Sequence, residues 1–249
     1  MRKRKQKQMS ESLLLGAILA TVGGFLDAHT YICRGKVFAN AETGNIVLMG
    51  AKLAEGDFKD AFFYLIPISA FACGVFCAEG IKKLFKQNNY IHWRQITVAA
   101  ETIALVFISF VEPTRMHNIF TNALVAFVCS LQVQSFRQIS GVPLTTTMCT
   151  GNLRSGTEHL FNAVTTKNKT VLKTAFKYYS IIFFFVLGAA IGAVLSSAIG
   201  RYSTLIAAGG LLAAFLLMFV NKEAEKREEI FERAEEEREE AEIKAAEKL

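Results

Sequence analysis

The sequence predicts an all-α membrane protein with six transmembrane helices and two re-entrant half-helices, arranged as an inverted 3+3 repeat. Three observations lead to this fold class: apolar runs of about twenty residues, the distribution of basic residues between them, and a tripeptide that occurs once in each half. An apolar run of about twenty residues crosses the hydrocarbon core of a bilayer as a helix.

Charged residues are concentrated near the two ends of the chain. The 249 residues include 28 basic and 22 acidic ones, of which six lie in residues 1–11 and nineteen in residues 222–249. The part between is too poor in charge for a soluble domain, in which about a quarter of the residues are charged. We therefore expect a basic cytoplasmic N-terminus (1–11), an integral membrane domain (12–221) and a charged cytoplasmic helix (222–249). The net charge of +6 reflects membrane topology, so no nucleic-acid partner is expected.

Six apolar runs predict the membrane spans. They cover residues 12–32, 60–81, 95–112, 118–136, 174–198 and 203–221. The first run is interpreted as an uncleaved span because Tyr31 and Arg34, and no soluble domain, follow it. Two further stretches, 36–55 and 143–164, are only half apolar and contain Thr, Asn and Gly near their starts.

The basic residues indicate how these two stretches cross the membrane. If both are re-entrant, the basic N-terminus, the loop at 82–94, the basic group at 154–177 and the tail after 221 all lie in the cytoplasm. If both cross fully, the basic loop at 82–94 lies outside, against the positive-inside rule. We therefore predict six spans, with both termini in the cytoplasm.

The two halves of the membrane domain share a tripeptide. Thr43-Gly44-Asn45 recurs as Thr150-Gly151-Asn152, and the same offset of 107 places Gln134 at the position of Asp27. The segment 71–74 corresponds to 185–188 after a seven-residue shift in the loop. Repeat one (12–112) and repeat two (118–221) each contain three crossings and one re-entrant stretch. Since three is odd, the second repeat enters from the opposite side, as in many secondary transporters. Two unrelated helix starts remain the alternative.

Several of these residues resemble a known family signature. The segments Gly24-Phe25-Leu26-Asp27-Ala28, Val37-Phe38-Ala39-Asn40 and Thr43-Gly44-Asn45-Ile46-Val47-Leu48-Met49-Gly50 resemble the signature of the YoaK-like family, bacterial multi-pass membrane proteins of uncharacterised function. The resemblance covers about residues 12–220. It implies a multi-pass protein of the cell inner membrane with about six spans, and it implies no substrate. Glu42 and the charged tail after 221 depart from the family pattern.

Asp27 is the sharpest candidate for a functional residue. A carboxylate within a span costs about 2.5 to 3.5 kcal/mol on insertion scales, so it normally faces a cavity or a partner. One interpretation is a structural ion pair with Arg34. The other is a proton- or cation-sensing carboxylate beside a transport path, with Tyr31 one turn away. His29 is expected to be a hydrogen-bonded interior histidine.

The two Thr-Gly-Asn tripeptides are the second candidate site. A half-helix that starts at mid-membrane depth presents unpaired N–H groups and a positive end, which favour an anion or a polar solute. Thr43 and Thr150 can cap these helices, Gly44 and Gly151 allow close approach, and Asn45 and Asn152 can donate and accept hydrogen bonds. Capping alone is the alternative role. If the repeat is inverted, Asn45 and Asn152 should lie within about 10 Å of each other, with Asp27 and Gln134 flanking the gap. Glu79 and Glu101 are interpreted as interfacial charges.

These features predict a membrane transporter or channel-like carrier for a small polar metabolite, with Asp27 coupling it to protons. The alternative is a non-transporting scaffold or regulatory subunit. No catalytic constellation is evident in the spans, so we expect no enzyme activity, cofactor or metal site. Besides the polar solute and protons, the expected partner is membrane lipid. The small-residue stripe Gly188, Gly192, Ser196 and Gly200 should pack inside the monomer, with a homodimer seam as the alternative.

Overall fold

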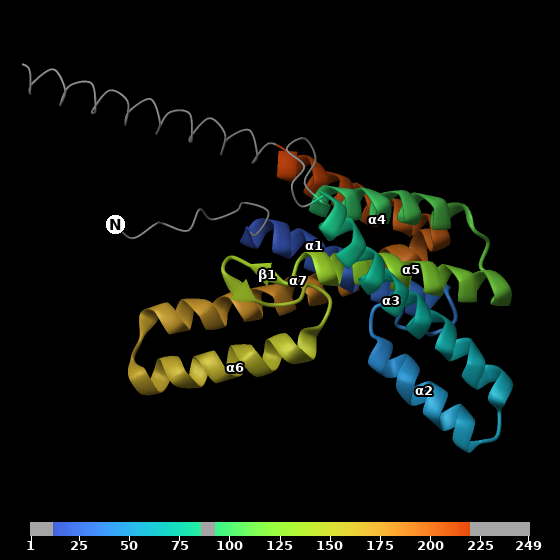
Figure 1. Ribbon diagram of the computed structural model, residues 1–249, viewed down its shortest axis with the longest axis horizontal. Coiled ribbons are helices and arrows are strands. Elements are labelled where there is room, and N and C mark those ends of the chain that lie inside the picture. Colours follow the sequence, from blue (N-terminus) through green and yellow to red (C-terminus); the bar gives the residue numbers. More distant parts are fainter. Residues whose placement is uncertain (1–11, 86–92, 220–249) are drawn as a thin grey trace, which may run out of the picture.

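The computed structural model describes residues 12–85 and 93–219, and nearly all of them are helical (Figure 1). The helices are α1 (Leu13–Cys33), α2 (Glu42–Ala54), α3 (Phe58–Phe85), α4 (Trp93–Phe110), α5 (Arg115–Ser135), α6 (Cys149–Thr166) and α7 (Lys169–Ile199). A two-stranded hairpin, β1 (Gln138–Ile139) and β2 (Val142–Pro143), lies between α5 and α6. A 3-10 turn, η2 (Gly200–Ser203), follows α7, and residues 204–219 are helical again. The expected terminal segments, 1–11 and 222–249, lie outside the described residues.

Five helical stretches in the described part of the chain are long and apolar enough to cross a membrane. They are α1, α3, α4, α5 and the stretch Lys169–Phe219. The last stretch has 51 residues and includes the turn at Gly200, whose φ of 59° interrupts the helix. A straight helix of that length would be about 75 Å long, against a hydrocarbon core of about 30 Å. Within the described residues, each of the six apolar runs expected from the sequence is mostly helical, and the protein is a multi-helix membrane protein.

The two stretches interpreted as re-entrant each contain a shorter helix that follows non-helical chain. α2 has 13 residues and packs along α3, whereas α6 has 18 residues and packs along α7. Both helices extend outward from the centre of the molecule in Figure 1. Neither is among the five stretches that are long and apolar enough to span.

The packing partners of each helix match those of the equivalent helix in the other half. α1 of the first half packs against α7 of the second, and α5 of the second half packs against α3 of the first. α2 on α3 matches α6 on α7, and α4 on α5 matches residues 204–219 on α1. The core between the halves therefore consists of helices that come from both.

Glycine residues allow two of these helix pairs, α1 with α7 and α3 with α5, to approach closely. A Cβ atom at Gly188 of α7 would overlap the carbonyl group of Thr21 in α1. A Cβ atom at Gly74 of α3 would overlap the Ser130 hydroxyl and the Phe127 carbonyl of α5. Gly74 and Gly188 are the positions that the alignment of the halves pairs with each other. Because Gly188 of α7 packs directly against α1, this part of the small-residue stripe packs inside the monomer, as expected.

Two clusters of buried side chains form on opposite faces of α1. The larger one joins α1, α4, α5 and residues 204–219, and includes Leu19, Leu26, Leu105, Val125 and Leu211. The smaller one joins α1 to α7 and to the hairpin, and includes Ala20, Ile139, Val142, Tyr178 and Ile181. α1 is therefore the central helix of the described protein.

The hairpin is an element that the apolar runs do not predict. Its turn residues Ser140 and Gly141 have φ of 54° and 76°, and a two-residue hairpin turn commonly takes positive φ at both positions. The phenol of Tyr178 in α7 donates to the carbonyl of Pro143 at 2.9 Å. The hairpin thus fixes the chain between α5 and α6 onto α7.

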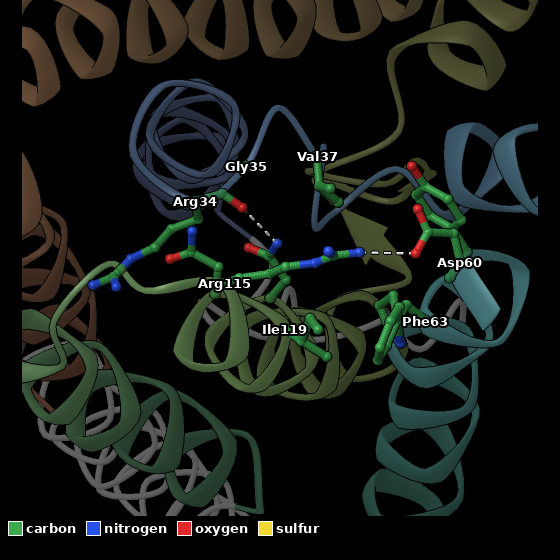
Figure 2. Close-up of a pocket in the computed structure, with 11 residues that line it drawn as sticks. Arg34, Gly35, Val37, Asp60, Phe63, Arg115 and Ile119 are labelled. Carbon is green, nitrogen blue, oxygen red and sulfur yellow. Dashed lines mark hydrogen bonds and ion pairs between the residues drawn. The ribbon is translucent and has the colours of Figure 1, made fainter.

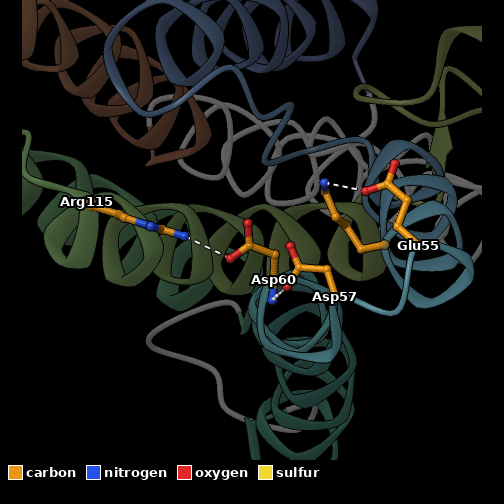
Figure 3. A network of polar contacts seen from close by, with 5 residues as sticks. Glu55, Asp57, Asp60 and Arg115 are labelled. Carbon is orange, nitrogen blue, oxygen red and sulfur yellow. Dashed lines mark hydrogen bonds and ion pairs between the residues drawn. The ribbon is translucent and has the colours of Figure 1, made fainter.

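An ionic network ties the α2–α3 loop to the start of α5 (Figure 3). Arg115 contacts Asp60 at 2.8 Å, and the backbone N–H of Asp60 donates to Asp57 at 3.1 Å. Lys52 and Glu55 pair at 2.7 Å at the end of α2. These charges gather at one end of the bundle, where the sequence predicts outer loops.

Candidate functional site

The chain segments that lead into α2 and α6 converge on Gly23 of α1. A Cβ atom at Gly23 would lie 3.0 Å from Cγ2 of Thr147 and 3.5 Å from Nδ2 of Asn40. Asn40 and Thr147 are separated by the same offset of 107 that relates the two tripeptides. Gly23 is the central residue of α1 (Leu13–Cys33). Equivalent points of the two halves therefore meet halfway along the central helix.

Asp27 lies one turn beyond Gly23 and holds the segment before α2. Its side chain is buried, with 8% exposed, and Oδ1 accepts a hydrogen bond from the backbone N–H of Asn40 at 3.0 Å. Asn40 lies two residues before Glu42, the first residue of α2. Asp27 is thus close to the start of α2.

The structural ion pair considered between Asp27 and Arg34 is not formed. Arg34 is fully buried, and its Nη2 donates to the carbonyl of Ile108 at 2.9 Å, near the end of α4. The Nε and Nη1 atoms of Arg34 have no hydrogen-bond partner. A guanidinium group is favourable at a helix C-terminus because the carbonyl groups there are unpaired and the helix dipole is negative. This attraction, rather than a carboxylate, positions Arg34.

The prediction that Thr43 and Thr150 cap the half-helices is wrong. The N-cap residues are Ala41 and Met148, which make no side-chain capping bond. Both helices begin one residue before the threonine, so each threonine falls within the first turn and its side chain is exposed. The hydroxyl groups are therefore not needed to start the helices.

The two tripeptide asparagines are buried at 1% and 3% exposure and bind local groups. Nδ2 of Asn45 donates to Oε2 of Glu42 at 2.9 Å. Asn152 accepts from the backbone N–H of Thr145 at 3.3 Å and donates to the Thr145 carbonyl at 2.6 Å. Asn152 thus closes the loop before α6.

The tripeptide glycines face open space. No heavy atom lies within 4 Å of a Cβ atom built at Gly44 or Gly151, and both have helical backbone without positive φ. The packing of the protein therefore does not require glycine at either position, unlike at Gly74 and Gly188.

Gln134 and Gln132 bind different parts of the protein. Gln134 donates to Glu79 of α3 and lines a pocket of about 340 Å³ together with Gly151 and Asn152. Gln132 is 1% exposed, and its Nε2 donates to the hydroxyl of Thr146 at 2.7 Å, in the segment that reaches Gly23. The offset of 107 directs attention to Gln134, whereas the glutamine that binds the segment reaching Gly23 is Gln132.

Tyr31 lies at the end of α1 against the segment before α2. Its ring is 40% exposed and stacks on Phe38 with 4.9 Å between the ring centroids. Nζ of Lys36 lies 4.7 Å from the centroid of the Tyr31 ring. Tyr31 therefore contacts this segment at its outer end, several residues from Asp27.

Glu101 is a buried residue, so its interpretation as an interfacial charge is wrong. It lies halfway along α4 with 1% exposed, and its hydrogen-bond partner is the Cys129 thiol of α5 at 3.9 Å. Val98 and Leu105, three and four positions away, are both fully buried. This helical spacing is the signal that could have placed Glu101 on the buried face. Glu79 is exposed and pairs with Lys82 at 3.4 Å, in agreement with a surface position.

His29 is an interior histidine, as expected. It is fully buried, and Nδ1 lies 3.1 Å from the Ser196 hydroxyl and 2.9 Å from the Ser203 hydroxyl. These contacts join α1 to the end of α7 and to η2. Among the described residues, no cluster of three or more His, Cys, Asp or Glu side chains could hold a metal ion.

A second pocket, of about 170 Å³, lies among the end of α1, α3 and the start of α5 (Figure 2). Its lining includes Arg34, Asp60, Tyr64, Pro67, Arg115 and Asn122. Figure 2 shows that Arg115 extends toward Asp60, whereas the guanidinium group of Arg34 turns away from this pair. The pocket beside Gln134 lies at the opposite end of α5, so the two pockets flank the bundle along that helix.

A family model described as "Protein of unknown function (DUF1275)" matches residues 15–218. This range is nearly that of the resemblance noted from the motifs, and the description likewise assigns no function. No curated protein and no solved structure matches the chain.

Proposed function

This chain belongs to DUF1275, a family without an assigned function. From the contacts within the protein, we propose that it is a transporter or channel-like carrier for a small polar metabolite. The solute binds where the segments before α2 and α6 meet α1, beside Asp27. The protein lies in the inner membrane of a bacterial cell with both termini in the cytoplasm.

The proposal includes six spans and an inverted repeat. Residues 204–219 form the sixth span after the turn at Gly200, and α2 and α6 are re-entrant half-helices. The exchange of packing partners between the halves supports this arrangement, since α1 packs with α7 as α5 packs with α3. Many secondary transporters combine inverted repeats with discontinuous helices that start near the bilayer midplane.

The observation that carries the proposal is the meeting of both halves at Gly23. Ten residues of α1 lie on either side of it, which corresponds to about 15 Å of helix in each direction. That distance is half of a hydrocarbon core of about 30 Å. Two capped helix starts with unrelated roles would have no reason to approach one residue at mid-depth.

Two pockets support the proposal that the central site is reached from both sides of the membrane. The pocket at Asp60 and Arg115 lies at the start of α5, and the pocket at Gln134 and Asn152 lies at its end. By the expected topology these ends face outside and cytoplasm respectively. A carrier needs such an opening on each side of a central site that is closed by the protein itself.

Asp27 links protonation to the segment before α2. Its carboxylate accepts the Asn40 N–H at 3.0 Å, and a charged acceptor makes a stronger hydrogen bond than a neutral one. Proton binding would therefore weaken the contact that holds this segment on α1. Release of the segment would open the central site toward one pocket.

Uptake by reconstituted protein tests the proposal. Proteoliposomes should accumulate small polar solutes from a labelled metabolite mixture, and a pH gradient should change the rate. Asp27→Asn should abolish the dependence on the gradient because the amide cannot titrate. Glu55→Gln is the matched control, since Glu55 is exposed at the end of α2 and pairs with Lys52, and it should behave as the wild type. Gradient-driven uptake that persists in Asp27→Asn would contradict the coupling role.

A further inference from the structure

The polar groups around Gly23 use their donors within the protein. The Asn40 backbone N–H binds Asp27 at 3.0 Å, and its side-chain Nδ2 donates to the Gly23 carbonyl at 3.3 Å. Nε2 of Gln132 donates to Thr146 at 2.7 Å. These bonds fix both converging segments onto α1 and α5.

The atoms that remain unpaired in this neighbourhood are three acceptor oxygens and one hydroxyl group, which can both accept and donate. They are Oδ1 of Asn40, Oε1 of Glu42, Oε1 of Gln132 and Oγ1 of Thr147. Asn40, Gln132 and Thr147 are exposed by only 1%, 1% and 4%. A buried acceptor without a donor is unfavourable, so several of them around one point favour a ligand that supplies donors or positive charge.

The formal charges at the same place are negative. Asp27 and Glu42 interact electrostatically with each other, and the described ion pairs assign no basic partner to either. The buried cation nearest in sequence, Arg34, directs its guanidinium group to Ile108. Glu42 also lies in the first turn of α2, where it offsets the positive end of that helix. The half-helix start at α2 is thereby made unsuitable for an anion.

From these acceptors and charges we infer that the central site binds a small monovalent cation through oxygen atoms. The cation is either the ammonium group of the transported solute or an alkali metal ion that accompanies it. An ammonium group has three donors and no acceptor, and hard metal cations prefer carboxylate, amide and hydroxyl oxygens. This inference rests on the proposed function and narrows its solute from polar in general to cationic or cation-coupled.

Ligand-dependent thermal stability of the purified full-length protein tests the inference without transport. The probes are methylammonium chloride, sodium chloride and potassium chloride, compared with N-methylglucamine chloride at equal ionic strength. N-methylglucamine acetate and phosphate form the anion arm. A saturable rise in Tm of about 2–4 °C is expected with at least one of the three small cations. A rise with methylammonium alone assigns the site to the solute's amine, and a rise with sodium or potassium alone assigns it to the accompanying ion.

Two variants locate the effect. Glu42→Gln and Thr147→Val remove oxygen ligands with little change in shape, and each should raise the apparent Kd of the active cation at least tenfold. The matched controls Glu55→Gln and Thr157→Val alter exposed residues and should leave that Kd unchanged. Stabilisation by acetate or phosphate alone, or no difference between the site and control variants, would overturn the inference.

The binding and uptake measurements distinguish the inferred cation site from the proposed transport function. Cation binding that depends on Glu42 and Thr147 in a protein without uptake would retain the cation site and contradict transport. Uptake of a polar solute by a protein that lacks such cation binding would retain transport and contradict the inference.

Discussion

At Gly74 and Gly188, the backbones of paired helices are so close that no side chain fits between them. Substitution by alanine should destabilise the protein by about 1–3 kcal/mol, because α3 must move from α5 or α7 from α1. Gly80→Ala and Gly209→Ala are matched controls, since no heavy atom lies within 4 Å of a Cβ there. These controls should be neutral or slightly stabilising, because alanine favours helix more than glycine does. Thermal unfolding in detergent measures all four. Equal stability of both groups would contradict the described packing.

His29 joins three elements through Ser196 and Ser203. The change His29→Leu should reduce stability by about 1–3 kcal/mol, because hydroxyl groups on α7 and η2 lose a buried partner. His117→Leu is the control, since His117 is exposed and binds only its own loop. The difference between the two variants in chemical denaturation is the measurement, and a smaller loss for His29→Leu than for His117→Leu would argue against the buried link.

At the scale of single residues, the sequence predicts whether a side chain is buried better than it predicts the hydrogen-bond partner of that side chain. The burial of Asp27 and His29 follows from their position in an apolar run, which is local information. The partner of Arg34 does not, because the carbonyl of Ile108 lies 74 residues away. The charge of Glu101 favours an interfacial position, whereas its helical spacing from Val98 and Leu105 indicates the buried position that the structure shows.

At the scale of helices, the expected topology can be tested by labelling single cysteines. In a background without the five native cysteines, Lys59→Cys and Arg115→Cys should react with an impermeant thiol reagent added outside intact cells. Lys83→Cys should react only after the membrane is opened, because the positive-inside rule places its basic loop in the cytoplasm. Outside labelling of Lys83→Cys would contradict six spans with re-entrant α2 and α6.

The apolar runs predict where helices form but not how each one begins. The six runs coincide with helical residues because hydrophobicity over about twenty positions is a strong local signal. The sequence favours threonine caps at the starts of α2 and α6, whereas Ala41 and Met148 occupy the N-cap positions. The interactions that fix these starts come from Asp27 and from Thr145 with Asn152, and the first of them is a tertiary contact. The β1–β2 hairpin was missed because two-residue strands carry too little periodicity to be recognised.

At the scale of the whole molecule, the two halves are intertwined. The repeated tripeptide directs attention to positions separated by 107 residues, and two such positions, Asn40 and Thr147, meet at Gly23. The exchange of α3 and α7 between the halves could not be derived from one sequence, because it depends on contacts between segments more than 50 residues apart. Any concerted motion of the two halves would therefore move both segments that meet at Gly23.

The most direct test of this account is disulfide formation at Gly23 in membranes, with the native cysteines replaced. Oxidation of Gly23→Cys/Thr147→Cys and Gly23→Cys/Asn40→Cys should cross-link both pairs. The built Cβ at Gly23 lies 3.0 Å from Cγ2 of Thr147, one bond beyond its Cβ, and 3.5 Å from Nδ2 of Asn40, two bonds beyond its Cβ. These distances bring both residues near the Cβ separation of about 3.5–4.5 Å that a disulfide needs. Gly23→Cys/Thr166→Cys is the control, since Thr166 lies at the far end of α6, and it should stay uncross-linked. Cross-linking of both test pairs is the predicted result. Cross-linking of neither, or of the control alone, would contradict a central site shared by the two half-helices.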